Sequence, residues 1–378
     1  MNRMVILGCG PVGRHIAIDL CKDPACEIIS VDINQDALEH LAKKHPVQIR
    51  VEDLSTVEGV TRAVEDADIV IGSVPGPLGY AMLEAVIRAG KNIVDISYFL
   101  EDPFGLDDLA REKGVTAVVD CGVAPGMSNI ILGDHMRKME VARYECYVGG
   151  FPKSRNAPLG YKTDFPVLEV FEEYSGPGRM VEDGKVVERP ALSETMTIDL
   201  PKVGTMACLN SDGLRTLIHT SVSDIPVMFE KTLRYPEHID QMRIFNDAGF
   251  FSQAPIQVKG ASVRPIDVTA KLFTPIWKYE PGEADLTVMR LIISGVEDGK
   301  PVTYTYDMYD EYDAATGTPS MARTTGYTCA AVTRLVLDGG YSQTGISAPE
   351  LVGRVNGCRE SVARYLAERG VLCRMQRS

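Results

Sequence analysis

The chain has 378 residues; 45% are hydrophobic, 24% are charged, and the formal net charge at pH 7 is −13. Its length predicts two domains, and an acidic balance without a basic block argues against nucleic acid and anionic membranes as partners. No apolar run approaches the roughly 20 residues that span a bilayer. The nine scattered cysteines include no CxxC pair and no Cys/His cluster at zinc spacing. We therefore expect no metal site, and reduced thiols in a cytoplasmic protein.

The first part of the chain alternates short β-rich runs with helical patterns. The expected strands cover residues 4–7, 27–32, 47–51, 69–74, 92–96 and 116–120. The expected helices cover residues 12–20, 35–44, 57–64, 78–89 and 106–112. Such regular alternation predicts an α/β fold, a doubly wound parallel sheet of the Rossmann type with right-handed crossovers. The strands are nearly continuous in Val and Ile, as expected when helices cover both faces of the sheet.

A glycine-rich turn, GCGPVG at residues 8–13, joins the first expected strand to the first expected helix. Gly8 permits the tight turn, Gly10 lets the backbone approach phosphates, and Gly13 allows close packing of the helix on the strand. The free N–H groups and the positive end of the helix dipole then face an anion. The turn therefore predicts a site for the pyrophosphate of a dinucleotide, to which Pro11 and Val12 contribute. The alternative is a Rossmann-like domain that has lost its cofactor.

The ends of the next strands carry the other expected cofactor contacts. Asp32 ends the second strand, where an acid accepts hydrogen bonds from the adenosine ribose and favours NAD over NADP, since a 2′-phosphate would be repelled. Asp53 follows the third strand and contacts the adenine or its ribose, or else only caps the following helix. Ser73, Val74 and Pro75 end the fourth strand, either as turn residues or against the nicotinamide half. The sequence thus predicts an NAD-dependent dehydrogenase.

The fifth and sixth strands end in the residues that we consider for catalysis. Asp95 and Asp120 lie in or just after apolar runs, where an unpaired carboxylate is costly to bury, so each is either a hydrogen-bonded cap or part of an active site. Tyr98 is a candidate proton carrier or substrate wall. Cys121 beside Asp120 has no histidine partner that the sequence assigns, and we expect it to be a packed core residue.

From about residue 143 the pattern changes to strands and turns, with helical patterns near 168–173, 214–219 and 239–248. We expect an α+β domain with a largely antiparallel or mixed sheet. The alternation in 301–309 suits a strand with one packed face that would also serve as a dimer edge. Residues 324–337 and 347–369 return to helix. We therefore divide the chain into a dinucleotide-binding domain (1–128), an inserted substrate-binding and dimerisation domain (129–317), and C-terminal helices that pack back on the first domain (318–378).

Polar residues of the second domain cluster at 161–162, 212–215, 234–238 and 323–325. An arginine fork is the usual device for binding an α-carboxylate, although most arginines are solvated surface charges. The substrate-binding candidates are Tyr161, Lys162, Arg215, Arg234 and His238.

Several blocks extend over nearly the whole chain: VDIN (31–34), SVPGPLG (73–79), NIVDISY (92–98), VVDCGVAPGMSN (118–129), YVGGFPKS (147–154), PLGYK (158–162), SDGLRTL (211–217), TLRYPEH (232–238), DAGFF (247–251), ARTTGY (322–327) and GISAPE (345–350). With the glycine turn they resemble the saccharopine dehydrogenase-like family, most closely its lysine 6-dehydrogenase branch. The patterns D-x-G-x-A-P-G-x-S-N and T-L-R-Y-P-x-H are the specific ones. They strengthen the expected roles of Asp120, Arg215, Arg234 and His238.

The resemblance implies a split Rossmann domain with an inserted α+β domain that forms a homodimer and closes the substrate cleft. It also implies NAD-dependent oxidative deamination of the ε-amine of L-lysine to allysine, which cyclises to piperideine-6-carboxylate, with release of ammonia. In that reading Arg215 and Arg234 hold the α-carboxylate, while Asp95, Tyr98 or Asp120 takes the proton. Three alternatives stay open: a glutamate-forming saccharopine dehydrogenase, a dehydrogenase of another basic amino acid, and a non-catalytic NAD-binding regulator.

Overall fold

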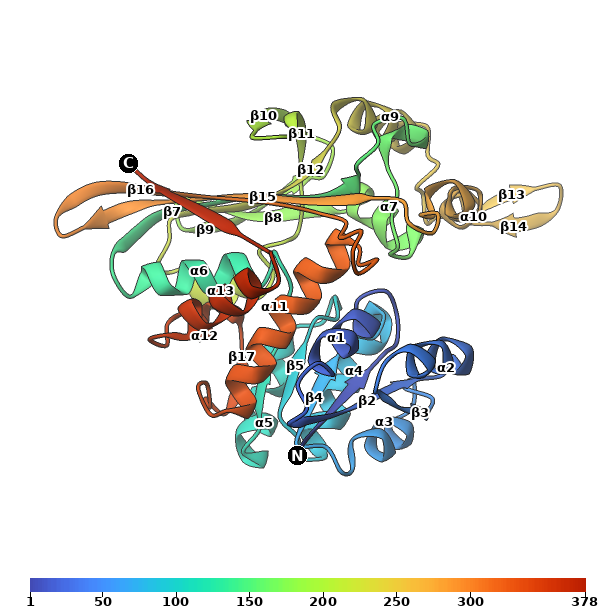
Figure 1. Cartoon of the computed structure of the whole chain (residues 1–378). Coiled ribbons are helices and arrows are strands. Elements are labelled where there is room, and N and C mark those ends of the chain that lie inside the picture. Colours follow the sequence, from blue (N-terminus) through green and yellow to red (C-terminus); the bar gives the residue numbers. More distant parts are fainter. The chain divides into compact units, whose positions relative to one another are not determined.

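The computed structural model describes residues 1–378 and divides into two compact units. The first unit contains Met1–Met139 and Ala322–Leu372, and the second contains Glu140–Met321 and Cys373–Ser378. Figure 1 shows the elements of each unit, coloured along the sequence. The chain passes from the first unit to the second after residue 139, whereas we expected this boundary at residue 128. Helix α6 (Met127–Met136) belongs to the first unit, because it packs on α12 (Pro349–Gly353) of that unit.

The first unit is built on a seven-stranded parallel sheet. Its strands are β1 (Asn2–Leu7), β2 (Cys26–Asp32), β3 (Gln48–Val51), β4 (Ile69–Gly72), β5 (Ile93–Asp95), β6 (Thr116–Val118) and β17 (Gly345–Ser347). Their spatial order is β17-β6-β5-β4-β1-β2-β3, and every pairing is parallel. This order confirms the predicted α/β doubly wound fold. The sheet reverses its order of addition at β1, so the turn after β1 lies at the topological switch point, where such sheets bind ligands.

The helices of the first unit are α1 (Gly13–Leu20), α2 (Gln35–Lys44), α3 (Val57–Val64), α4 (Gly76–Arg88), η1 (Pro103–Leu106), α5 (Asp107–Lys113), α6, most of α11 (Ser320–Leu337), α12 and α13 (Cys358–Glu368). No helix of the structure is both long and apolar enough to cross a membrane.

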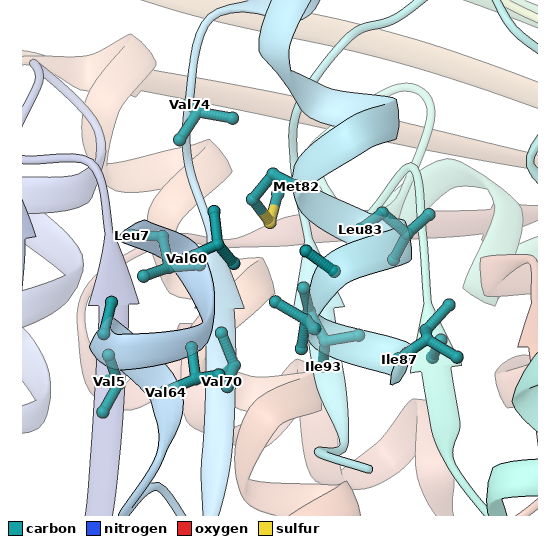
Figure 2. Packing of buried hydrophobic residues seen from close by; sticks show 14 of the residues in the cluster. Val5, Leu7, Val60, Val64, Val70, Val74, Met82, Leu83, Ile87 and Ile93 are labelled. Atoms are coloured by element: carbon teal, nitrogen blue, oxygen red, sulfur yellow. The ribbon is translucent and has the colours of Figure 1, made fainter. Parts of the chain in front are cut away.

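Apolar side chains of β1, β4 and β5 pack against α3 and α4 to form the core on one side of this sheet. Figure 2 shows Val60 and Val64 of α3, and Leu83 and Ile87 of α4, directed toward the strands. Their spacing of four residues places each pair on one helix face. Each fully buried side chain of this size contributes roughly 1.5–3 kcal/mol by leaving water. The periodicity of these helices therefore fixes them on the sheet and leaves the strand ends free for ligands.

The single helix predicted at 347–369 is two helices, α12 and α13, with a break at residues 354–357. The flanking residues add two strands that the sequence analysis did not predict. Residues 345–347 form β17 at the edge of the parallel sheet, beside β6. Residues 373–377 form β18 (Cys373–Arg377), which pairs with β16 (Lys300–Glu311) in the second unit. Both strands are short, with no alternation long enough to distinguish them from loops.

The second unit contains a nine-stranded mixed sheet. Its strands are β7 (Glu140–Pro152), β8 (Pro177–Glu182), β9 (Lys185–Pro190), β10 (Met196–Leu200), β11 (Gly204–Asn210), β12 (Val227–Arg234), β15 (Asp285–Glu297), β16 and β18. The main order is β10-β11-β12-β7-β15-β16-β18, with β8 and β9 added beside β12. Only the pairing of β12 with β7 is parallel. The expected strand at 301–309 lies within β16, but it has β15 and β18 on its two sides. Our prediction that it forms a dimer edge is therefore wrong.

The other elements of the second unit are η2 (Pro158–Gly160), α7 (Val167–Ser175), α8 (Thr216–Ser221), α9 (Pro236–Asp247), the hairpin of β13 (Ile256–Val258) and β14 (Ala261–Val263), and α10 (Pro265–Trp277). An aromatic core joins α7, α9 and α10, with Phe171 stacked on Phe251 and in edge contact with Trp277. The sequence analysis did not find α10, whose pattern contains Pro275, a residue that normally ends or kinks a helix.

Candidate active site

The glycine turn after β1 is held by backbone contacts that no larger residue would permit. Gly8 has φ +107°, and a Cβ there would lie 2.3 Å from the carbonyl oxygen of Ser73. A Cβ on Gly13 would lie 2.1 Å from the carbonyl oxygen of Gly8. A Cβ on Gly10, in contrast, would meet no atom within 4 Å. Gly8 and Gly13 are therefore required by the fold itself, whereas Gly10 keeps an open space beside the turn.

The first turn of α1 faces this space without a side-chain cap. Val12 is the N-cap residue and contributes no capping hydrogen bond, and the carbonyl of Pro11 accepts from the ring of His15 at 2.6 Å. The start of a helix attracts anions through its N–H groups and its dipole. An open space above Gly10, beside an uncapped helix start, fits a pyrophosphate group.

Asp32 at the end of β2 is tied to the glycine turn. Its Oδ2 accepts the Cys9 backbone N–H at 2.6 Å, and its Oδ1 accepts the Asn34 N–H at 2.8 Å. A carboxylate has about four acceptor positions, so both oxygens keep capacity for further donors. The side chain is thus oriented as an acceptor beside the turn, which suits ribose hydroxyls and opposes an added phosphate.

Asp53 differs from Asp32, because a local turn uses its carboxylate. Its Oδ1 accepts the N–H and the hydroxyl of Ser55 at 2.9 and 2.6 Å, and these hydrogen bonds lower the pKa of Asp53. Helix α3 is capped by Thr56 instead. The alternative that Asp53 caps this helix is therefore wrong, and a contact with the adenine or its ribose stays a prediction.

Ser73, Val74 and Pro75 connect β4 to α4 beside the glycine turn. The Ser73 N–H donates to the carbonyl of Leu7 at 2.9 Å, and Pro75 is the N-cap residue of α4. Val74 is buried. These residues therefore line the same sheet edge as Gly8 and serve the fold in addition to any ligand contact.

Asp95 ends β5 as a fully buried carboxylate. Its Oδ1 accepts the N–H and the hydroxyl of Ser97 at 3.1 and 2.8 Å. Gly72 of the neighbouring strand makes room for it, since a Cβ there would lie 2.1 Å from the same oxygen. The sequence analysis did not predict Ser97 and Gly72 as neighbours of Asp95; the Ser97 contact is a local turn, whereas the fit against Gly72 depends on cross-strand packing, for which the sequence has no signal. Tyr98 follows and is 49% exposed.

Asp120 lies just after β6 with a strained backbone. Its φ is +53°, a conformation that costs energy for a residue other than glycine, and its side chain is 5% exposed. Such strain is commonly retained where a side chain must be aimed. Burial, with the charges of Cys329, Asp95 and Asp120, raises the pKa of Cys121 well above its usual value. A thiol held neutral is a poor nucleophile, which supports a packing role for Cys121.

Arg234 in the second unit is buried in a network of aromatic and acidic side chains. Its Nε donates to the Tyr174 hydroxyl at 2.9 Å, and its Nη2 donates to Tyr161 at 3.4 Å and to Glu173 at 3.2 Å. The guanidinium lies 4.5 Å from the centre of the Tyr161 ring. Burial opposes the charge, but Tyr161, Tyr174 and Glu173 together raise the pKa of Arg234 above its usual value. A permanent, fixed cation results.

His238 holds the other end of this network. Its Nε2 is 2.7 Å from the Tyr174 hydroxyl, and its Nδ1 is 2.7 Å from the carbonyl oxygen of Leu159. The carbonyl can only accept, so Nδ1 carries the proton and Nε2 accepts from Tyr174. Burial and the charge of Arg234 lower the pKa of His238 to about 3. The neutral ring is therefore held by the Leu159 carbonyl and accepts from the Tyr174 hydroxyl, which in turn accepts from Arg234.

The structure brings Tyr161, Arg234 and His238 together, while two members of the network, Glu173 and Tyr174, were missed by the sequence analysis. Both lie near the end of α7, where only a helical period was visible. Their role depends on the approach of α7 to β12 and α9, which no motif within 167–175 encodes.

Lys162 and Arg215 have surroundings that differ from those of Arg234. The Lys162 Nζ donates to Glu283 at 2.5 Å, and this contact lowers the pKa of Glu283 against the opposing effect of burial. Arg215 has φ +45° and a 6% exposed side chain, just before α8. A buried arginine with a strained backbone is a second positioned cation in this unit.

Two family models match adjoining parts of the chain. The saccharopine dehydrogenase NADP binding domain matches residues 4–118, and the saccharopine dehydrogenase C-terminal domain matches residues 122–371. Together they cover both units.

Two fungal relatives extend over most of the chain. Saccharopine dehydrogenase [NADP(+), L-glutamate-forming] of Schizosaccharomyces pombe is 22% identical, with 79% of this chain and 82% of the relative aligned. The protein of the same name from Pyricularia oryzae is 24% identical over 92% of this chain and 93% of the relative. The solved structure of apo saccharopine dehydrogenase (L-Glu forming) from Saccharomyces cerevisiae is similar with a TM-score of 0.81, at 19% identity and full coverage of both chains. That likeness confirms the fold.

Proposed function

The chain belongs to the saccharopine dehydrogenase family, and from this premise we propose that it oxidises the C–N bond at the ε-carbon of a lysine-derived amino acid, with a nicotinamide dinucleotide as hydride acceptor. The first unit binds the dinucleotide and the second binds the amino acid. The observation that carries this proposal is the open space at Gly10 beside the uncapped start of α1 and the oriented carboxylate of Asp32.

The proposed cofactor is NAD rather than NADP. Asp32 offers acceptor oxygens at the end of β2, which suit two ribose hydroxyls and repel a 2′-phosphate. The matching family model and the fungal relatives are named for NADP. Substitution of Asp32 therefore tests whether this chain prefers NAD to NADP. When bound, the nicotinamide ring supplies the acceptor for the hydride.

Acidic residues of the first unit are proposed to accept the proton that the substrate ammonium must lose. A substrate ammonium has a pKa near 10.4, and only the neutral amine can assist hydride loss from its carbon. Asp95, fixed by Ser97, and Asp120, fixed by its backbone, are the candidate bases, and Tyr98 is a candidate proton carrier. A neighbouring carboxylate also stabilises the iminium ion that forms when the hydride leaves.

The second unit is proposed to supply the carboxylate anchor. Arg234 has a fixed orientation because Tyr174, Tyr161 and Glu173 hold three of its donor contacts. A guanidinium kept in place by such contacts loses less freedom on binding a carboxylate than a solvated one. Arg215 is the second anchor, and Lys162 and His238 shape and support the site.

Saccharopine is the substrate that we propose first, because the similar fungal proteins are L-glutamate-forming saccharopine dehydrogenases. In the forward reaction the ε-carbon loses a hydride and the secondary amine loses a proton. Water then adds to the resulting C=N bond, and the C–N bond breaks. The lysine-derived part leaves as the aldehyde, and the nitrogen leaves with L-glutamate.

L-Lysine, our expectation from sequence resemblance, is the second candidate. The specific observation in its favour is that Lys162, a cation of the second unit, is already neutralised by Glu283. Such pairing suits a substrate with a single carboxylate better than one with three. The chemistry is the same, except that ammonia leaves in place of L-glutamate.

The deciding experiment measures reduced cofactor at 340 nm for purified protein with NAD or NADP and with saccharopine, L-lysine, L-ornithine or L-arginine. Turnover of saccharopine with L-glutamate released supports the first substrate. Turnover of lysine with ammonia released moves the assignment to the second. Cofactor binding without turnover of any amino acid would contradict the enzymatic proposal and favour a binding protein.

A further inference from the structure

The block GISAPE at residues 345–350, which the proposed function does not use, borders the loop of residues 120–126 in the first unit. We call these residues the Asp120 loop. The Val119 N–H, just before this loop, donates to the Ser347 carbonyl at 3.0 Å. Helix α12, which begins at Pro349, packs on α6, the helix that follows the loop. The block is therefore in contact with the chain on both sides of the Asp120 loop.

The close crossing of α6 and α12 fixes the place of Glu350. A Cβ on Gly133 of α6 would lie 2.0 Å from the Glu350 carbonyl oxygen. A Cβ on Gly353 of α12 would lie 2.1 Å from the Ile130 carbonyl oxygen. Each helix thus has a glycine where the backbone of the other helix makes contact. Because backbone meets backbone at two points, the start of α12 has a fixed position against α6.

The Glu350 carboxylate is buried at this crossing and contacts Asn129 of α6. Glu350 is 0% exposed and Asn129 is 1% exposed, and the Glu350 Oε2 accepts from the Asn129 Nδ2 at 3.1 Å. A buried carboxylate costs free energy that an apolar side chain of the same size avoids. An ionised carboxylate can only accept hydrogen bonds, so it directs the amide nitrogen of Asn129 toward α12 and the amide oxygen away from it.

This orientation of Asn129 ties it to the end of the Asp120 loop. The amide oxygen accepts the Gly126 N–H at 3.2 Å and the Ser128 hydroxyl at 2.9 Å. If the amide were reversed, its NH2 group would face the Gly126 N–H, and both groups are donors. Glu350 therefore selects the amide orientation in which Asn129 can hold Gly126.

Gly126 in turn packs against the part of the loop that follows Asp120. A Cβ on Gly126 would lie 2.0 Å from the Gly122 carbonyl oxygen, so the two backbones are in contact. The Gly122 N–H donates to the carbonyls of Asp120 and Pro125, both at 3.1 Å. Asp120 itself has the strained φ of +53°. The contacts that keep this strained residue in place thus extend from the loop through Asn129 to Glu350.

We propose that Glu350 is a positioning residue: through Asn129 it holds the Asp120 loop in the conformation that directs the Asp120 carboxylate at the reacting substrate. This inference rests on the proposed function, in which Asp120 is a candidate base. A base acts only within hydrogen-bond reach of its proton, so a loop that shifts slows the chemical step more than it weakens binding.

The test exchanges the donor and the acceptor of the contact between Glu350 and Asn129. Asn129→Asp sets one acceptor against another, and kcat is expected to fall about 30-fold while the KM values for cofactor and amino acid stay within about twofold. Glu350→Gln keeps an acceptor oxygen for Asn129 and is expected to keep kcat within about threefold. The double variant Asn129→Asp, Glu350→Gln reverses the hydrogen bond and is expected to restore kcat to within about fivefold of the wild type.

The matched control is Asp134→Asn, on the same helix α6. Asp134 is also buried, but it accepts from Arg137 and Lys138 at 3.0 and 2.6 Å and has no contact with Asn129. Its kcat is expected to stay at the wild-type value even if its melting temperature falls.

Amide hydrogen exchange, measured by mass spectrometry without substrate, gives a readout that does not depend on activity. Glu350→Met removes the acceptor at similar volume and is expected to speed exchange in residues 120–128 at least about tenfold, whereas Glu350→Gln leaves it unchanged. A wild type without turnover but with this exchange pattern would refute the proposed function and still support the hold of Glu350 on the loop.

Three results would overturn the proposal. The first is a Glu350→Met variant with wild-type exchange in this loop. The second is a double variant no more active than Asn129→Asp alone. The third is a Glu350→Met change that lowers kcat as much in an Asp120→Asn background as in the wild type, because Glu350 would then act independently of Asp120.

Discussion

The glycine turn of the first unit and the Arg234 network of the second represent two ways to prepare a binding site. In the turn, backbone atoms are the proposed binding groups, and the turn requires residues without a side chain, because Gly8 and Gly13 have no space for a Cβ. In the network, side chains of α7 and α9 and the backbone carbonyl of Leu159 in η2 hold the guanidinium of Arg234, at the end of β12, in place. The first site depends on a few adjacent residues, whereas the second depends on residues far apart in the chain. We therefore expect their responses to substitution to differ in kind.

The largest expected effect is on the glycine turn. Gly8→Val introduces a branched side chain at φ +107°, against the Ser73 carbonyl, so the turn must deform. Cofactor affinity is expected to fall at least about 100-fold, equivalent to roughly 2.7 kcal/mol. Gly10→Ala is the control, because its methyl group meets no atom of the chain and leaves the melting temperature unchanged while weakening binding. Isothermal titration with NAD measures the affinity of both variants, and thermal denaturation measures their melting temperatures. A Gly8→Val variant that binds NAD normally would contradict the role of this turn.

The next effect is on the carboxylate anchor. Arg234→Met removes the cation from the network and is expected to raise the KM for the amino acid about 100-fold with a small change in kcat, as for lost uniform binding. The KM for the cofactor stays constant. Arg290→Met is the matched control, since Arg290 forms a two-contact ion pair with Asp307 on the same sheet. If both variants changed KM equally, the effect would be structural and the anchor role would fail.

Cofactor preference is expected to respond more moderately. Asp32→Ser removes the negative charge that opposes a 2′-phosphate, and the ratio of kcat/KM for NAD to that for NADP should fall about 30-fold, or roughly 2 kcal/mol. Asp53→Ala serves as the control, because Ser55 already occupies that carboxylate. A wild type that prefers NADP would disprove the prediction before any variant is made.

Breaking the network at its centre has a smaller effect. Tyr174→Phe removes the hydroxyl between Arg234 and His238 and leaves the Arg234 Nε without that acceptor. We expect a loss of about 1–2 kcal/mol in the free energy of unfolding, the usual cost of an unpaired buried polar group. The KM for the amino acid should rise about fivefold, a mild form of the Arg234 effect. Urea unfolding and steady-state kinetics test the two parts, and an unchanged KM would separate Tyr174 from the anchor.

The smallest effect is a pH dependence of stability. The pKa of His238 is lowered to about 3 in the folded protein, so the ring stays neutral while the unfolded chain gains a proton below about 6.5. Stability is therefore full above pH 6.5 and falls as the pH drops toward 3, by about 0.7 kcal/mol between pH 7 and 6 for this group. His238→Gln should flatten that slope. His15, whose pKa is lowered to about 4 by burial, keeps its own contribution in both proteins. Equal slopes would show that His238 is not the source.

Much of the first unit could be predicted, because its information is local. The helices at 35–44 and 57–64 and the glycine turn follow from periodicity and from residue types that adjacent positions reveal. Asp32 could be placed because the end of the second strand in such a sheet returns to the glycine turn. The role of Asp53 could not be assigned from the sequence, since a carboxylate at that position can either cap the following helix or contact a ligand. Only the structure shows that this carboxylate accepts from Ser55 and that Thr56 caps α3.

In the second unit the sequence determined the residue types but not their partners. It identified Arg234 and His238 through one block, 232–238, yet the residues that orient them, Glu173 and Tyr174, lie about sixty positions earlier in an ordinary helix. Likewise β18, at the C-terminal end of the described residues, pairs with β16 in the nine-stranded sheet. As a result, β16, which we expected at an edge, is an interior strand. By itself, then, the sequence determined the parallel fold and the glycine turn, because short-range sterics and periodicity encode them. The tertiary structure decided the Arg234 network and the pairing of β18 with β16, because those depend on which distant segments meet when the chain is packed.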